Sequence, residues 1–272
     1  MTSTANQITS ALRDESWELD LTPELCGKFL SELNRCDITI INPEISCSFR
    51  VDEPKVIIDK SCLCLPESGL NIEFRNVLSA LLSKDPLLPT KLNLVLTSLD
   101  RDEQLTIELP RPEEKAVGLL TKELIRTHDH LPASATMSDQ HRSLCPCCTI
   151  KRDETRSRIS SHPLYHIISF ACFINQDIWL DFNRSMTSCS RAFSPTRECH
   201  PEGVISLTSP EGIMAIDLGE VFQCIAHLAD FEGDESTIFQ CYNSHGNLLF
   251  SLIQKNSKLF EVWNLMNQKS QD

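Results

Sequence analysis

Apolar residues at helical spacing mark the first folded segment of the chain. Leu25, Phe29 and Leu33 recur every four residues, so they share one face of a helix. Thr22 fits the N-cap of this helix, and Pro23 suits its first turn. The pattern therefore predicts a helix over residues 22–33, preceded by a polar and flexible tail at residues 1–16.

Short apolar runs separated by polar turns follow this helix, and such runs are typical of strands. They lie at residues 38–41, 55–58, 92–97 and 105–109. A polar turn at Asp100–Glu103 joins the last two, whereas residues 71–82 fit a strand or a helix. A second helix is expected from Pro112. Its apolar stripe consists of Ala116, Val117, Leu120 and Leu124.

The second half of the chain shows the same alternation. Residues 204–218 are strand-like, and two further apolar runs, 237–242 and 248–253, flank a type I turn at Asn243–Gly246. A closing helix carries its apolar face on Leu259, Val262, Trp263 and Met266. Residues 127–161 have little apolar periodicity and are rich in Ser, His, Arg and Cys, so we interpret them as a linker.

These two halves can be aligned as an internal repeat. Pro66–Leu78 matches Pro210–Phe222 at an offset of 144, with Pro, Glu, Ile and Val coinciding. The hairpin Val95–Leu109 matches Ile238–Leu252 at an offset of 143, so that Leu105 and Leu109 fall on Leu248 and Leu252. Ser46–Ser48 lies near Ser188–Ser190 at an offset of 142.

The fold class that follows is α+β. We expect two related units, at residues 17–126 and 162–272, each a mainly antiparallel β-sheet with flanking and C-terminal helices. Two similar units tend to pack with pseudo-twofold symmetry, and the cleft between them is then a favoured ligand site.

Composition narrows the function classes. The 272 residues are 41% hydrophobic and carry a formal net charge of −13, which disfavours general nucleic-acid binding. A membrane span is not expected, because the apolar runs are too short, and residues 1–16 lack the apolar core of a signal peptide. The 13 cysteines are odd in number and scattered through apolar runs. We therefore expect mostly reduced core cysteines in a cytoplasmic protein.

Two segments of the second half resemble a known family. They are Pro210–Phe222 and the hairpin Ile238–Leu252, followed by the terminal helix. These segments are similar to the haem-utilisation family of bacterial haem-uptake operons, which comprises cytosolic hemin-degrading factors and haem carriers. The resemblance implies a tandem repeat with a large antiparallel sheet in each copy, and haem held in the cleft between the repeats.

The resemblance also implies a haem ligand directly after the first repeat. Thr127–His130 occupies that place and looks like the ligand stretch of the family. His128 would bind the haem iron as a neutral imidazole, with His130 nearby and Arg126 as a cationic partner for a propionate. Two features depart from the family pattern: Leu131-Pro132 breaks a helix after the ligand, and Ile253–Ser257 holds one lysine where a basic stretch is common.

The most unusual local sequence is Cys145-Pro-Cys147-Cys148, with His141 four residues earlier. Thiolates and imidazole are zinc ligands, so these four residues form a candidate zinc site, although adjacent cysteines reach one tetrahedral centre poorly. Cys145-Pro146 also fits a short haem-sensing motif that binds through thiolate. The third interpretation is a set of exposed, reduced and redox-sensitive thiols.

Three functional hypotheses remain open from the sequence. The first is a cytosolic haem-binding protein, either a carrier or an enzyme that degrades haem oxidatively with an external reductant. The second is a non-catalytic adaptor with a degenerate duplicated fold, whose acidic surface binds a basic protein partner. The third is a module stabilised by zinc at the Cys145 cluster. His162 and His166 could also share a helix face as ligands, and the oligomeric state stays open.

Overall fold

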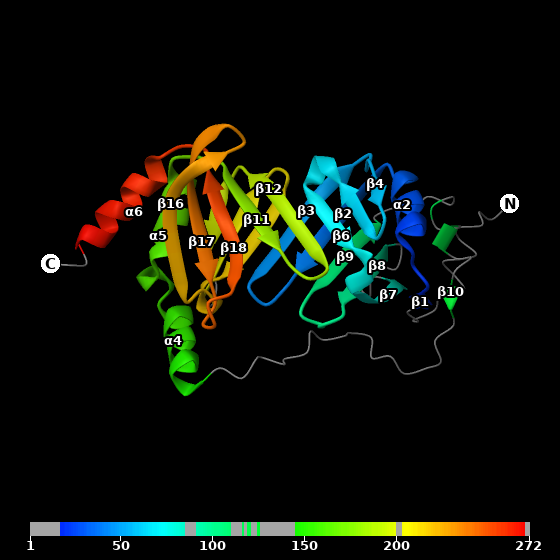
Figure 1. Ribbon diagram of the computed structural model, residues 1–272, viewed down its shortest axis with the longest axis horizontal. Helices are drawn as coiled ribbons and strands as arrows, with labels where there is room; N and C mark the ends of the chain where they lie inside the picture. The colour runs from blue at the N-terminus through cyan, green and yellow to red at the C-terminus, as the bar shows by residue number, and fades with distance from the viewer. Residues whose placement is uncertain are drawn as a thin grey trace. The chain divides into compact units, whose positions relative to one another are not determined.

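The chain divides into two compact units in the computed structural model (Figure 1). The structure describes residues 17–84, 91–109, 116, 119–120, 124–125, 145–199 and 203–269. Unit 1 contains the first half of the chain except residues 43–47, and in addition Arg184–Ser188. Unit 2 contains the remainder, including Pro43–Cys47. Each unit therefore incorporates a five-residue segment from the other half of the sequence.

The first predicted helix is confirmed as α2 (Pro23–Ser31). The backbone N–H of Leu25 donates to Oγ1 of Thr22, and Pro23 occupies the first turn. The buried face of α2 includes Phe29 and Leu30, and the helix contacts strands β4 (Ile57–Asp59) and β5 (Cys62–Leu65) of the same unit. Hydrogen bonding at the cap and burial of one apolar face thus fix the helix where its sequence pattern predicted it.

Unit 1 contains two sets of antiparallel strands. In the first set the strand order is β10-β1-β7-β8-β9-β2-β3, and in the second it is β4-β5-β6. The bounds are β1 (Trp17–Leu19), β2 (Arg35–Ile41), β3 (Ile45–Asp52), β4 (Ile57–Asp59), β5 (Cys62–Leu65), β6 (Leu70–Glu73), β7 (Val77–Lys84), β8 (Leu92–Ser98), β9 (Gln104–Leu109) and β10 (Leu124–Ile125). Residues 71–82, which the sequence left undecided, form β6, a short 3-10 turn and β7.

Unit 2 repeats these strands in the order β16-β17-β18-β11-β12 and, in its second set, β13-β14-β15. The bounds are β11 (Ile178–Asn183), β12 (Thr187–Phe193), β13 (Arg197–Cys199), β14 (Val204–Ser209), β15 (Gly212–Asp217), β16 (Gln223–Phe231), β17 (Asp234–Tyr242) and β18 (Leu248–Gln254). Its helices are α4 (Pro146–Ser157), α5 (Pro163–Phe173) and α6 (Lys258–Lys269), of which α6 is the predicted closing helix.

The shared strand order confirms the α+β fold with two related copies. β7-β8-β9-β2-β3 corresponds strand by strand to β16-β17-β18-β11-β12, and β4-β5-β6 corresponds to β13-β14-β15. Registers agree as well, because Cys62 pairs with Glu73 in β5–β6 and Val204 pairs with Asp217 in β14–β15. The predicted boundaries of the repeats, at residues 126 and 162, stay predictions.

One detail of the sequence alignment is wrong. Val95 pairs with Thr106 in the first copy, whereas Ile238 pairs with Ile253 in the second. The two strands of the hairpin therefore cannot both match at an offset of 143. An offset of 145 in both strands places the pair Val95–Thr106 on the pair Gln240–Ser251. Burial agrees with the structural match, because Leu105 is fully buried and Leu248 is 47% exposed. The segments that connect the two strands, residues 99–103 and 243–247, are equally long, and the second hairpin has a register irregularity between Cys241 and Tyr242.

The segments that the two halves exchange are held in equivalent ways. In unit 1 the backbone N–H of Glu73 donates to the carbonyl of Met186 at 2.8 Å. In unit 2 the N–H of Asp217 donates to the carbonyl of Glu44 at 2.9 Å. These donors are 144 residues apart and these acceptors 142 apart, which are the offsets found in the sequence. The duplication therefore includes the exchange of segments, and not only the separate strands.

A buried carboxylate also holds the exchanged segment of unit 1. Oε2 of Glu103 accepts the backbone N–H groups of Met186 at 3.0 Å and Thr187 at 3.1 Å, and Oε1 accepts the hydroxyl of Thr187. Glu103 is 2% exposed, although the sequence pattern placed it in a polar turn. Burial raises the pKa of this carboxyl, against the opposing effect of the hydrogen bonds from Thr187 and Met186.

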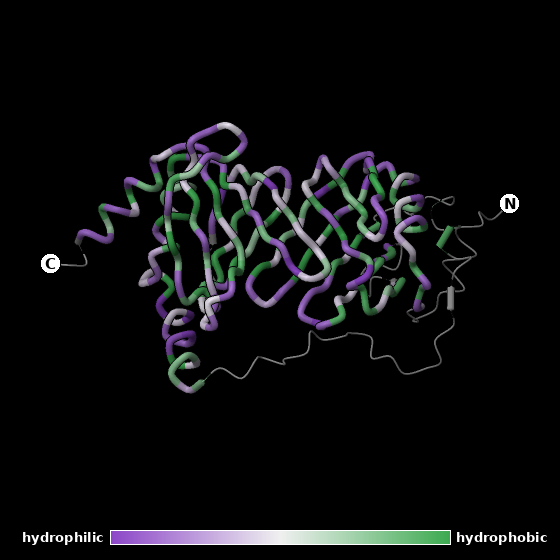
Figure 2. The backbone as a smooth tube through the Cα atoms, in the orientation of Figure 1, coloured by the Kyte–Doolittle hydropathy of each residue, from purple (hydrophilic) through white to green (hydrophobic). Residues whose placement is uncertain are grey.

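The cores follow the alternation that predicted the strands. Buried and half-exposed residues alternate along β2, β8 and β9, and Figure 2 shows the corresponding alternation of hydropathy along the chain. Five of twelve described cysteines are buried, namely Cys26, Cys36, Cys47, Cys189 and Cys241, so the expectation that most cysteines lie in the core holds for fewer than half of them. In the part of the chain that the structure describes, helices long and apolar enough to cross a membrane are absent.

Candidate functional site

Helix α4 lies inside the segment interpreted as a linker from the sequence. Cys145 is its N-cap residue and Pro146 occupies its first turn. α4 has no fully buried residue, so it lacks the apolar stripe by which helices are recognised in a sequence. Polar contacts attach α4 to the rest of unit 2.

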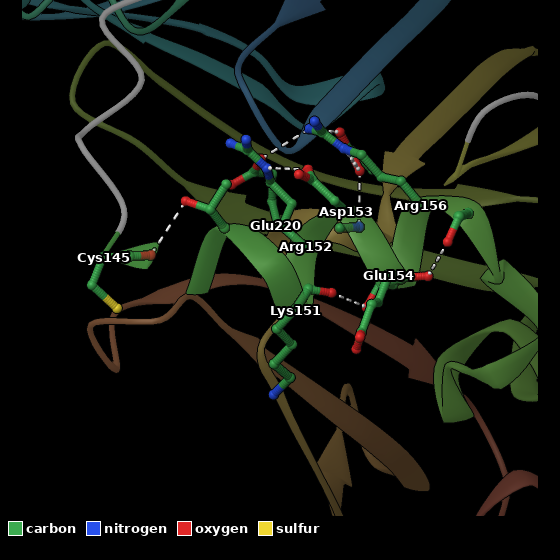
Figure 3. Close-up of polar contacts among 12 residues, drawn as sticks. Cys145, Lys151, Arg152, Asp153, Glu154, Arg156 and Glu220 are labelled. Carbon is green, nitrogen blue, oxygen red and sulfur yellow. Dashed lines mark hydrogen bonds and ion pairs between the residues drawn. The ribbon is translucent and has the colours of Figure 1, made fainter. Parts of the chain in front are cut away.

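An arginine on α4 provides the main attachment. Arg156 donates to Oδ2 of Asp217 at 2.5 Å and to Oε1 of Glu220 at 3.0 Å, and Arg152 lies 3.8 Å from the same Glu220 oxygen. Figure 3 shows Arg152, Arg156 and Glu220 grouped on one side of the helix, while Lys151 points away from them. Burial raises the pKa of Glu220, an effect that Asp217 increases and the two arginines oppose.

Two glycines allow α4 to approach the strands. A Cβ atom on Gly203 would lie 2.5 Å from Cα of Arg156, and one on Gly219 would lie 2.8 Å from Cγ of Arg156. By register, Gly203 corresponds to Ser61 in the first copy, and Gly219 corresponds to Arg75. The second copy therefore has glycine at two positions where the first copy has larger side chains. This difference is the sequence signal from which the docking of α4 could have been predicted.

His162 and His166 do not form the ligand pair considered from the sequence. His162 is the N-cap of α5, where Nδ1 accepts the N–H of Leu164 at 3.2 Å and Nε2 lies 3.2 Å from the carbonyl of Val221. Both ring nitrogens are thus engaged, whereas His166 is exposed. Burial lowers the pKa of His162, and Lys151 lowers it further.

The three cysteines at the start of α4 lie together. The Sγ atoms of Cys145 and Cys147 are 2.7 Å apart, and all three sulfurs, including that of Cys148, lie within 4.8 Å of one another. Cys145 and Cys147 are exposed and Cys148 is half-buried. Figure 3 shows Cys145 at the start of the helix. The structure therefore brings together three of the four predicted zinc ligands.

The chemical environment of this cluster differs from that of the core cysteines. The pKa of Cys145 is lowered to about 7 by the hydrogen bond of the Cys147 thiol and by the backbone N–H of Cys148. The pKa of Cys148 is raised to about 11 by its hydrogen bond with Cys145 and by burial. Burial raises the pKa values of Cys26 and Cys36 to about 12. Cys145 is thus suited to act as a thiolate near neutral pH.

The other predicted site residues fall elsewhere in the chain. Arg126, His128 and His130, the predicted haem-binding residues, lie outside the described residues, as does His141. Their placement therefore stays a prediction from the sequence. Most of the helix predicted from Pro112 also lies outside the described residues, but Leu124, which was predicted for its apolar stripe, lies in strand β10 instead.

Comparison with known proteins adds information on the fold. Neither a protein-family profile nor a curated protein sequence matches the chain. Among solved structures, the haem-degrading enzyme ChuS of Escherichia coli O157:H7 matches with a TM-score of 0.66 and 9% identity, covering 93% of this chain and 85% of ChuS. The apo form of PhuS, a haem-binding protein from Pseudomonas aeruginosa, matches with a TM-score of 0.61 and 9% identity, covering 94% of this chain and 86% of PhuS.

The holo form of PhuS gives a TM-score of 0.62, again at 9% identity, over 93% of this chain and 85% of PhuS. An identity of 9% is too low to transfer residue roles, so these matches concern the course of the backbone. They agree with the duplicated strand order of the two units. The similarity to the haem-utilisation proteins ChuS and PhuS that the sequence segments suggested is therefore confirmed for the fold.

Proposed function

We propose that this protein binds haem and acts as a haem carrier or a haem-degrading enzyme. One observation carries the proposal: the chain follows the fold of a haem-degrading enzyme and of a haem-binding protein over more than nine-tenths of its length. The matched segment exchange in the two units agrees with a duplicated fold.

The proposed iron ligand is the imidazole of His128, with His130 beside it and Arg126 paired with a propionate. Three candidate side chains of α4 and α5, those of His162, Arg156 and Arg152, are already engaged by other groups of the protein. Both ring nitrogens of His162 are engaged, and Arg156 and Arg152 are paired with carboxylates. The prediction that haem lies in the cleft between the repeats belongs to this proposal and rests on the sequence resemblance.

Titration with hemin tests the proposal. We expect a saturable one-to-one shift of the Soret band in the wild-type protein. His128→Ala should weaken binding at least about tenfold, because the proposed protein ligand of the iron is removed. His245→Ala is the matched control, because His245 lies exposed in the β17–β18 turn and should leave the titration unchanged. Weak, unsaturable binding by the wild type would contradict the proposal, as would equal affinity for wild type and His128→Ala.

A second measurement distinguishes a haem carrier from a haem-degrading enzyme. Oxidative degradation consumes the Soret band when ascorbate and oxygen are added to the hemin complex, whereas a carrier retains that band. If hemin does not bind, the hypothesis of a non-catalytic adaptor takes the place of the haem-binding proposal. The net charge of −13 then directs the search to basic protein partners.

Zinc is not part of the proposed function. A closed structural zinc site needs four ligands, and among the described residues the Cys145 cluster supplies three. The four-ligand site therefore depends on His141 and stays a prediction, which elemental analysis of the purified protein tests.

A further inference from the structure

The thiol cluster of Cys145, Cys147 and Cys148 has the geometry of a site for disulfide chemistry. The Sγ atoms of Cys145 and Cys147 are 2.7 Å apart, and the sulfur of Cys148 lies within 4.8 Å of both. A disulfide forms when one thiolate attacks a bound disulfide and a second thiol is close enough to displace the product. The cluster places an attacking thiol and a second, displacing thiol within one turn of a helix.

Access to the cluster is open. Cys145 and Cys147 are exposed, and the attachments of α4 to unit 2 begin further along the helix, at Lys151, Arg152 and Arg156. Reaction at the first turn therefore leaves these attachments intact.

We propose that this cluster is a thiol–disulfide exchange site for low-molecular-weight disulfides, with Cys145 as the nucleophile. Glutathione disulfide is a representative oxidant of this class. The Cys145 thiolate attacks one sulfur of glutathione disulfide, forms a mixed disulfide and releases one glutathione thiolate, which takes up a proton.

A neighbouring thiol of the cluster then loses its proton and attacks the sulfur of Cys145. This step forms the intramolecular disulfide and releases the second glutathione. Two protein thiols are thereby oxidised to one disulfide, and one glutathione disulfide is reduced to two glutathione molecules. The proposal goes beyond the haem function and does not depend on it.

Close cysteine pairs elsewhere among the described residues provide a comparison. Cys62 and Cys64 have sulfurs 3.7 Å apart in β5, where both are half-buried. Cys224 and Cys241 have sulfurs 3.9 Å apart, and Cys241 is buried. Proximity is thus shared by all three groups, while exposure at the start of a helix belongs to the Cys145 cluster. A Cys62→Ser/Cys64→Ser variant is therefore a suitable control.

The test uses the full-length reduced protein and glutathione disulfide, followed by alkylation, intact mass measurement and peptide mapping. We expect the wild type to lose two free thiols, to retain no glutathione and to carry a disulfide within residues 145–148. Cys145→Ser should slow the loss of thiols at least about tenfold, because the exposed nucleophile is gone. The Cys62→Ser/Cys64→Ser control should react like the wild type.

A second variant traps the intermediate. Cys147→Ser/Cys148→Ser should retain one glutathione on Cys145, because no neighbouring thiol can displace it. The fold should tolerate these changes, since α4 has no buried residue. The proposal would be overturned if Cys145→Ser reacted at the wild-type rate, or if the trapping variant bound no glutathione. Stoichiometric metal that keeps the wild-type cluster reduced during the reaction would also overturn it.

Discussion

Glu103→Ala is expected to destabilise unit 1 by about 3 kcal/mol, because it leaves buried hydrogen-bond donors without an acceptor. The carboxylate accepts two backbone N–H groups and one hydroxyl from Met186 and Thr187, both of which are buried. Water cannot replace the lost acceptor without entering this site. The exchanged segment Arg184–Ser188 should therefore detach more readily from unit 1.

Glu103→Gln provides the matched control, because its amide oxygen still accepts the backbone N–H groups. We expect it to cost about 1 kcal/mol. Urea unfolding followed by Trp17 fluorescence measures both variants in a background with Trp179→Phe and Trp263→Phe, since Trp17 then reports unit 1 alone. Equal midpoints for Glu103→Ala and the parent would show that the buried carboxylate does not hold the segment.

The pH dependence gives an independent check of the same residue. The pKa of Glu103 is raised by burial, so the native state holds this proton more tightly than the unfolded chain. The contribution of Glu103 to stability should therefore be largest below the usual carboxyl pKa of about 4.3 and fall as the pH rises through the raised native pKa. Glu103→Gln should lack this part of the pH profile.

Gly203→Ala is the second change with a large expected effect. The residue has a φ of +84°, and an added Cβ would lie 2.5 Å from a backbone atom of Arg156. The backbone conformation costs about 1–2 kcal/mol for an alanine, and the clash adds to it because α4 must move. We expect α4 to separate from unit 2, with loss of the Arg156 contacts to Asp217 and Glu220.

Gly233→Ala separates the two causes. Gly233 has a φ of +87°, but an added Cβ would meet nothing within 4 Å. It should therefore show the conformational cost alone. Hydrogen exchange measured by mass spectrometry on residues 146–157 should be faster in Gly203→Ala and unchanged in Gly233→Ala. The close packing of α4 on this glycine would be refuted if the two variants protected the helix equally.

Regular elements were predictable wherever burial follows a simple period. Thr22, Pro23 and the spacing of Leu25, Phe29 and Leu33 predicted α2, and alternating apolar residues predicted β8 and β9. The common order of the two copies followed from short matches such as Pro66–Leu78 with Pro210–Phe222. These features depend on local propensity and one-sided burial, both of which a sequence records directly.

Features that depend on distant partners were not predictable. The sequence predicted Glu103 to be a turn residue because the groups that donate hydrogen bonds to it, in Met186 and Thr187, lie more than eighty positions away. The sequence predicted a linker in place of helix α4 because the contacts of this helix are ionic and are made with the distant residues Asp217 and Glu220. The hairpin offset was wrong because a shift by two residues keeps every side chain on the same face of a strand and so preserves the alternation of apolar residues.

The central claim is that this duplicated fold binds haem through the imidazole of His128. The most direct measurement is a crystal structure of the one-to-one complex with hemin. We predict an Nε2 or Nδ1 atom of His128 bonded to the iron, with Arg126 near a propionate. Iron bonded to another residue, such as the Cys145 thiolate, or hemin bound without an axial protein ligand would contradict the account.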